Sequence, residues 1–183
     1  MAYINRKIFL WELIGIVFVV VLGSIFHFVF EWLNFWPPIG GFFPVNESVW
    51  EHLKLVYWPI VIFSIIEYFP LKKKANNCLL AKFLAIIVAC LTIVIFFYAY
   101  TAILGEDLLI FDILSFVLGI VLGFLVSYKI LTLKELPQWS MVISLISLIL
   151  VGFIFILFTY YPPELPIFQD PISGLYGIII HIH

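Results

Sequence analysis

Histidine, glutamate and lysine side chains occur at helical spacing in two apolar segments, where ionisable groups are rare. His27 and Glu31 are four residues apart and would share one face of a helix. Glu51, His52 and Lys54 fall within about one turn of a second segment. Neutral imidazoles and carboxylates are the ligand types that zinc and related divalent metals use. Without a metal, the same groups could hold a proton or a small cation.

These ionisable residues stand out because the surrounding chain is strongly apolar. Of its 183 residues, 65% are apolar and 11% are charged, whereas a soluble domain has roughly 45–50% apolar and about 25% charged residues. The net charge of −2 provides no basic surface for nucleic acid. Cys78 and Cys90 form no paired thiolate motif and are interpreted as apolar filler. The composition therefore predicts an integral membrane protein whose main surroundings are the lipid bilayer.

Five segments are long enough to cross a membrane as helices, which takes about 20 apolar residues. They cover residues 8–34, 47–70, 79–104, 108–128 and 139–161. The loops between them are short, and no linker is long enough to separate two domains. We therefore expect a single all-α transmembrane domain over residues 1–183, built as a bundle of five helices, with residues 162–183 as a tail.

The basic residues predict the orientation of this bundle, because Lys and Arg concentrate on the cytoplasmic side. With a cytoplasmic N-terminus, eight of the nine basic residues lie inside and only Lys54 lies outside. The eight are Arg6, Lys7, Lys72, Lys73, Lys74, Lys82, Lys129 and Lys134. Five spans then place the tail on the outer face, in the plasma membrane of a bacterium or archaeon.

On this topology the outer half of the bundle collects polar residues that the positive-inside rule does not demand. Asn46 is the expected N-cap of the second helix, with Glu47 in its first turn. Residues 51–54 then lie about 6–10 Å below the cap, close to the depth of His27 and Glu31. The residues predicted to line an outward-facing site are His27, Glu31, Asn46, Glu47, Glu51, His52, Lys54 and Asp112. The terminal His181 and His183 are interpreted as an incidental tail.

Two interpretations of this site remain open. In the first, His27, Glu31, Glu51 and His52 supply ligands for a divalent metal such as zinc. The adjacent Glu51 and His52 would point about 100° apart on a helix, which argues against both binding one ion. In the second, the residues form a metal-free proton or cation network. Each could also have a purely structural role: Lys54 could neutralise Glu51 or Glu31, and His27 could be an interhelical donor.

Two further features are predicted to be structural. Gly119 and Gly123 form a GxxxG face that allows another helix to approach closely. Its default role is packing within the chain, and a homo-oligomer contact is the second role. Glu67, beside Tyr68 at the inner end of the second segment, is expected to lie at the membrane interface.

Three sequence blocks resemble a family of uncharacterised prokaryotic membrane proteins classed as a domain of unknown function. They are PVNESVWEHLKLVYWP from Pro44 to Pro59, FFYAYTAILG in the third segment, and YYPPELPIFQDPISGLYG after the fifth. The resemblance covers essentially the whole chain and implies a small polytopic membrane protein. It implies no catalytic residue. It does imply that the segments around 46–54 and 162–177 belong together.

Three hypotheses for the function follow. The first is a protein that binds or transports a small cation or polar solute through the outward-facing site. The second is a metal-assisted hydrolase acting on an outer-leaflet lipid, with Glu51 or Glu31 as general base. The third is a structural or partner-binding membrane subunit in which the buried charges only pair with one another.

Overall fold

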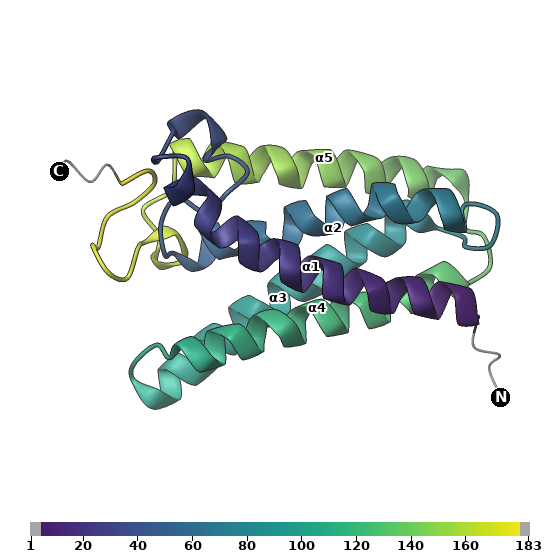
Figure 1. The fold of residues 1–183 in the computed structure, drawn as a ribbon, viewed down its shortest axis with the longest axis horizontal. Helices are drawn as coiled ribbons and strands as arrows, with labels where there is room; N and C mark the ends of the chain where they lie inside the picture. Colours follow the sequence, from purple (N-terminus) through teal and green to yellow (C-terminus); the bar gives the residue numbers. More distant parts are fainter. Residues whose placement is uncertain (1–4, 180–183) are drawn as a thin grey trace.

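A computed structural model describes residues 5–179 and shows five long helices (Figure 1). The helices are α1 (Arg6–Trp32), α2 (Val49–Leu71), α3 (Cys78–Leu104), α4 (Leu109–Thr132) and α5 (Gln138–Tyr160). Two short 3-10 helices, η1 (Pro37–Ile39) and η2 (Pro166–Phe168), lie in the connections. Each of the five predicted segments corresponds to one helix. All five helices are long and apolar enough to cross a membrane, which indicates a multi-pass membrane protein.

The helices form a bundle in which each crosses the length of the molecule (Figure 1). α1 contacts α2 and α4, and α3 contacts α2, α4 and α5. The main core lies between them and includes Val56, Ile60, Phe63, Ile86 and Phe124. The outward faces are apolar: Ile149 of α5, for example, is 65% exposed. A continuous exposed apolar surface of this kind suits lipid contact.

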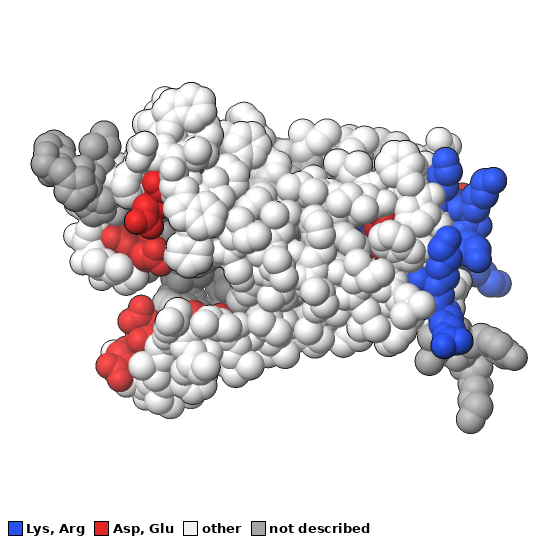
Figure 2. All heavy atoms as spheres, viewed as in Figure 1, with Lys and Arg blue, Asp and Glu red and all other residues white. Residues whose placement is uncertain are grey.

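Charged side chains separate to opposite ends of the bundle (Figure 2). The basic end carries Arg6, Lys7, Lys72, Lys73, Lys74, Lys129 and Lys134, and the acidic end carries Glu31, Glu47, Glu106, Asp107 and Glu164. Lys82, which was counted with the basic residues of the inner side, is instead 2% exposed inside the bundle. The predicted charge separation is therefore present, except that Lys82 is buried inside the bundle.

α1 and α2 approach closely because a free carbonyl on α2 faces a glycine on α1. Pro59 lies inside α2 and has no N–H to donate to the carbonyl of Leu55. That carbonyl oxygen lies where a Cβ on Gly23 would come within 2.5 Å of it. Only a residue without a side chain fits between the two helices here.

Gly23→Ala should therefore separate α1 from α2 and destabilise the fold. Because the obstructing atom belongs to the backbone of Leu55, the clash cannot be relieved by a rotamer change, and we expect a loss of about 1–3 kcal/mol. Thermal unfolding in detergent measures it. Ser24→Ala is the matched control, since Ser24 is exposed and its hydroxyl bonds only the Val20 carbonyl of its own helix. Equal melting temperatures for the two variants would contradict this account.

The GxxxG face of α4 packs against α3. A Cβ on Gly119 would lie 2.8 Å from the Ala89 carbonyl oxygen, and one on Gly123 would lie 2.5 Å from that of Ala85. Packing within the chain, the default role expected from the sequence, is thus the role these glycines have. A homo-oligomer stays a prediction.

The start of α2 differs from the sequence-based expectation. The N-cap is Ser48, whose hydroxyl accepts from the Glu51 N–H, so the predicted Asn46 cap is wrong and Glu47 precedes the helix. Asn46 instead stabilises the turn before the cap, because its side-chain oxygen accepts from the Ser48 N–H at 2.9 Å. Its amide also donates to the Gly177 carbonyl at 2.8 Å. The loop before α2 is thereby joined to the tail, as the resemblance implied.

Candidate metal centre

Two histidines from different helices meet a glutamate at the acidic end. The Nε2 atoms of His27 on α1 and His52 on α2 lie 3.1 Å apart. An oxygen of Glu47, in the loop before α2, lies 3.4 Å from the His52 Nε2 and 3.7 Å from the His27 Nε2. These three residues form the one group of metal-ligand side chains within 4.8 Å found in residues 5–179. We call it the His27–Glu47–His52 site.

The separations within this site match those expected around a tetrahedral metal. Two ligand atoms that are each ~2.0–2.1 Å from zinc lie about 3.3–3.4 Å apart at the tetrahedral angle. The three observed separations of 3.1, 3.4 and 3.7 Å bracket that value. Two histidines and one glutamate also form a ligand set that proteins use for zinc. The arrangement thus needs only small side-chain movements to hold an ion.

The imidazole of His52 is oriented by the helix that carries it. Its Nδ1 lies 2.9 Å from the Ser48 carbonyl oxygen, one turn earlier. Because a carbonyl can only accept, Nδ1 carries the proton and the neutral ring presents an unprotonated Nε2 to the site. A second hydrogen bond of this kind is the usual way in which proteins orient a metal-binding histidine.

Glu47 is positioned by the tail. Its backbone N–H donates to an Asp170 carboxylate oxygen at 3.2 Å. Asp170 is buried, and its other oxygen accepts from the Ser173 N–H at 2.9 Å, which holds the tail in a turn. His52 holds the pKa of the Glu47 carboxyl below its usual value, because the Nε2–H of the protonated imidazole donates to this carboxylate, although partial burial opposes the shift. Glu47 is therefore an anionic ligand over most of the pH range in which the imidazoles titrate.

Glu51 and Lys54 form a buried ion pair beside this site. The Lys54 ammonium lies 2.6 Å from a Glu51 oxygen and donates to the Gly40 carbonyl at 2.7 Å. Glu51 also accepts from the Val45 N–H at 2.9 Å and from the Thr159 hydroxyl at 3.2 Å. The pair connects the loop before α2 with α5. The oxygens of Glu51 and the ammonium of Lys54 all have hydrogen-bond partners, and the pairing of Lys54 with Glu51 considered from the sequence is present.

The remaining predicted site residues lie apart from the two histidines. Glu31 is exposed and makes no side-chain hydrogen bond or ion pair within the described part of the chain. Asp112 accepts a hydrogen bond from the Tyr100 hydroxyl at the α3–α4 turn and acts on His52 only electrostatically. His181 and His183 lie outside the described residues. Of the four residues proposed as metal ligands, His27 and His52 are brought together, while Glu31 and Glu51 are not.

A second charged cluster, towards the basic end, was not predicted from the sequence. Lys82 of α3 lies 2.6 Å from an oxygen of Glu12 on α1 and 2.6 Å from an oxygen of Glu67 on α2. Glu67, for which an interfacial position was expected, is 3% exposed and faces the interior of the bundle. The available signal was three ionisable residues in three apolar segments at similar depth. We call this cluster the Glu12–Lys82–Glu67 triad.

The model of one protein family, described as a family of unknown function, DUF6512, matches residues 1–178 of the chain. No curated protein and no solved structure matches it.

Proposed function

Since the chain belongs to this family, DUF6512, whose description assigns no activity, we propose a function from the geometry: the protein binds a divalent metal cation, with zinc as the best fit, at the His27–Glu47–His52 site. The observation that carries the proposal is the convergence of three ligand atoms within 4.8 Å from two helices and a loop. We place this site on the outer face of a bacterial or archaeal plasma membrane, with the N-terminus in the cytoplasm, because basic residues concentrate on the cytoplasmic side.

The solvent exposure of the three side chains supports an exchangeable cation rather than a buried structural ion. The side chains of His27, His52 and Glu47 are 32%, 29% and 44% exposed. Structural zinc sites are usually closed by four protein ligands, whereas residues 5–179 provide three here. A cation could therefore enter from the acidic end, where the surrounding carboxylates favour positive charge. Binding, and delivery or transport of the bound cation, is the function these features support best.

A metal-assisted hydrolase of an outer-leaflet lipid is the second candidate. Three protein ligands leave the fourth zinc position to water, which is the arrangement of catalytic zinc. The two general bases expected from the sequence do not support a hydrolase. Glu51 is paired with Lys54, and Glu31 is not part of the His27–Glu47–His52 site. Metal-dependent turnover of a lipid ester or amide would favour the hydrolase, and metal-dependent uptake into vesicles would favour transport.

Metal content tests the binding proposal directly. The protein is purified in detergent without a histidine tag or chelator, equilibrated with zinc, passed through a desalting column and measured by mass spectrometry. We expect about one ion per chain in the unmodified protein and a loss of most of it in His52→Ala and Glu47→Gln, because removing one of three ligands leaves too few.

Glu31→Gln is the matched control for this experiment. It removes a carboxylate from the same end of α1 without touching the three ligands, so it should retain the full zinc content. Size-exclusion elution checks that every variant is folded. Stoichiometric zinc in His52→Ala, or none in the unmodified protein, would refute the proposal.

A further inference from the structure

The Glu12–Lys82–Glu67 triad has one more acidic group than basic groups, so it would carry a net negative charge inside the bundle if both carboxyl groups were ionised. Two carboxylates share one ammonium, and the side chains of all three residues are 3–4% exposed. A net negative charge in this cluster is costly, on the order of several kcal/mol, because the surrounding side chains shield it almost completely from bulk water. At the acidic end, by contrast, Glu51 is balanced one-to-one by Lys54.

Hydrogen bonding is also incomplete in the triad. Lys82 donates to one oxygen of Glu12 and forms an ion pair with one oxygen of Glu67, while the second oxygens, Oε2 of Glu12 and Oε1 of Glu67, are buried without a hydrogen-bond partner. The Lys82 ammonium also lies over the rings of Phe124 and Phe63, at 4.8 and 5.7 Å from their centres. These cation–π contacts add favourable interactions for the ammonium but provide no hydrogen-bond donor for the two partnerless oxygens.

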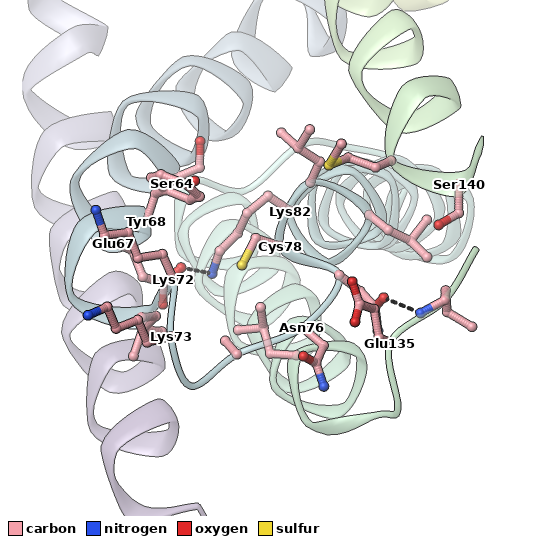
Figure 3. Close-up of a pocket in the computed structure, with 18 of the residues that line it drawn as sticks. Ser64, Glu67, Tyr68, Lys72, Lys73, Asn76, Cys78, Lys82, Glu135 and Ser140 are labelled. Atoms are coloured by element: carbon pink, nitrogen blue, oxygen red, sulfur yellow. Dashed lines mark hydrogen bonds and ion pairs between the residues drawn. The ribbon is translucent and has the colours of Figure 1, made fainter. Parts of the chain in front are cut away.

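A cavity leads from the basic end to this triad (Figure 3). It has a volume of about 890 Å³, and its lining includes Glu67 and Lys82 at depth and Lys72 and Lys73 near the basic end. In Figure 3 the Lys82 ammonium points to the Glu67 carboxylate, with Cys78 beside it. A cavity of this size, lined by several polar groups, can hold water.

We propose that the triad is a proton-binding site: Glu12 and Glu67 together hold one exchangeable proton, reached from the basic end through this cavity. The proton sits on one of the two partnerless oxygens. It makes the triad neutral, with one ionised carboxylate paired to Lys82 and one carboxylic acid. Losing the proton creates a buried negative charge, so proton release is coupled to entry of water or of a cation into the cavity.

The groups around the triad are compatible with this assignment. α3 adds Cys78, which interacts electrostatically with both acids and with Lys82. α4 presents the apolar Phe124, and α5 contributes the neutral Ser140 and Gln138 to the cavity wall. Among the described residues, the cavity is further lined by the titratable groups Tyr68, Lys72, Lys73 and Glu135. Only Glu135 among these adds negative charge, and the two lysines outnumber it.

Infrared difference spectroscopy tests the proposal, because a protonated carboxyl group has its own carbonyl stretch. Spectra of the detergent-purified protein are compared between about pH 6 and about pH 9, the range in which buried glutamates are known to titrate. We expect one carboxylic acid band per chain that disappears as the pH rises. The band should shift in heavy water, because its proton exchanges through the cavity.

The single-acid variants give the sharpest result. Glu12→Gln leaves Glu67 with Lys82 as a neutral pair, and Glu67→Gln leaves Glu12 with Lys82, so each variant should lose the band completely. Asp112→Asn is the control, since Asp112 is a half-buried carboxylate outside the triad, and should keep it. No band in the unmodified protein, a band that survives in either glutamine variant, or loss only in Asp112→Asn would overturn the proposal. Zinc content, measured on the same samples, tests the acidic-end site independently.

Discussion

Lys54→Met is expected to be among the most destabilising single substitutions in this protein. It leaves the Glu51 carboxylate 2% exposed with no countercharge. Breaking a buried ion pair by removing one partner costs about 3–5 kcal/mol, because the other charge remains desolvated. Contacts from the Lys54 ammonium to Gly40 and Thr159 would be lost as well. Reversible unfolding in mixed detergent micelles near neutral pH measures the loss.

A second substitution separates the charge effect from simple loss of packing. Adding Glu51→Gln to Lys54→Met removes the stranded charge while keeping an oxygen for the Val45 N–H, so the double variant should be more stable than Lys54→Met alone. Lys129→Met, which removes an exposed lysine from the last turn of α4, is the control and should change the free energy of unfolding by less than about 0.5 kcal/mol. A Lys54→Met protein as stable as Lys129→Met would contradict the role of the pair.

Zinc affinity at the His27–Glu47–His52 site should fall steeply in acid. The ligands must be deprotonated to bind metal. The pKa of Glu47 is lowered by the hydrogen bond that the protonated His52 donates, so this carboxyl stays ionised when the imidazoles, which ordinarily titrate near pH 6.5, take up protons. We therefore expect a plateau in affinity above about pH 7.5 and a loss of up to about a hundredfold per pH unit below about pH 6, where two imidazoles must each release a proton.

Competition with a colorimetric zinc chelator at several pH values measures this slope. His27→Gln removes one of the two imidazoles and should halve the slope on a logarithmic scale, besides weakening binding at all pH values. Glu31→Gln should keep the slope unchanged, since Glu31 is not a ligand. An affinity that does not change between neutral pH and about pH 5.5 would show that the histidines do not hold the ion.

The five helices could be predicted from the sequence because long apolar runs have few other folds available to them. Residues 8–34, for example, become Arg6–Trp32. The site was predicted only in part. Depth along each helix follows from the rise per residue, which correctly placed His27 and His52 at one level. The rotation of α2 about its axis does not follow from depth. This rotation decides that Glu51 meets Val45 and Thr159 while His52 meets His27.

Glu47 and the Glu12–Lys82–Glu67 triad show what local reasoning misses. Glu47 becomes a candidate ligand because the chain turns before Ser48, and that turn depends on Asp170, 123 residues away. Lys82 was placed on the cytoplasmic side by the positive-inside rule, which says nothing about burial between helices. Its two acidic partners come from α1 and α2, and only the packing of three helices brings them to it.

The bonds between the tail and the loop before α2 determine when the acidic end can be completed during synthesis. The ribosome delivers α1 and α2 to the membrane first, with both histidines. Thr159, Asp170 and Gly177, which hold Lys54, Glu47 and Asn46, emerge 105, 123 and 131 residues later than these partners. Until then the Glu51–Lys54 pair lacks its α5 hydroxyl, and Glu47 lacks the carboxylate that positions it. The His27–Glu47–His52 site is consequently completed only after residues up to Asp170 have been synthesised, so a chain truncated before α5 carries both histidines without a positioned Glu47.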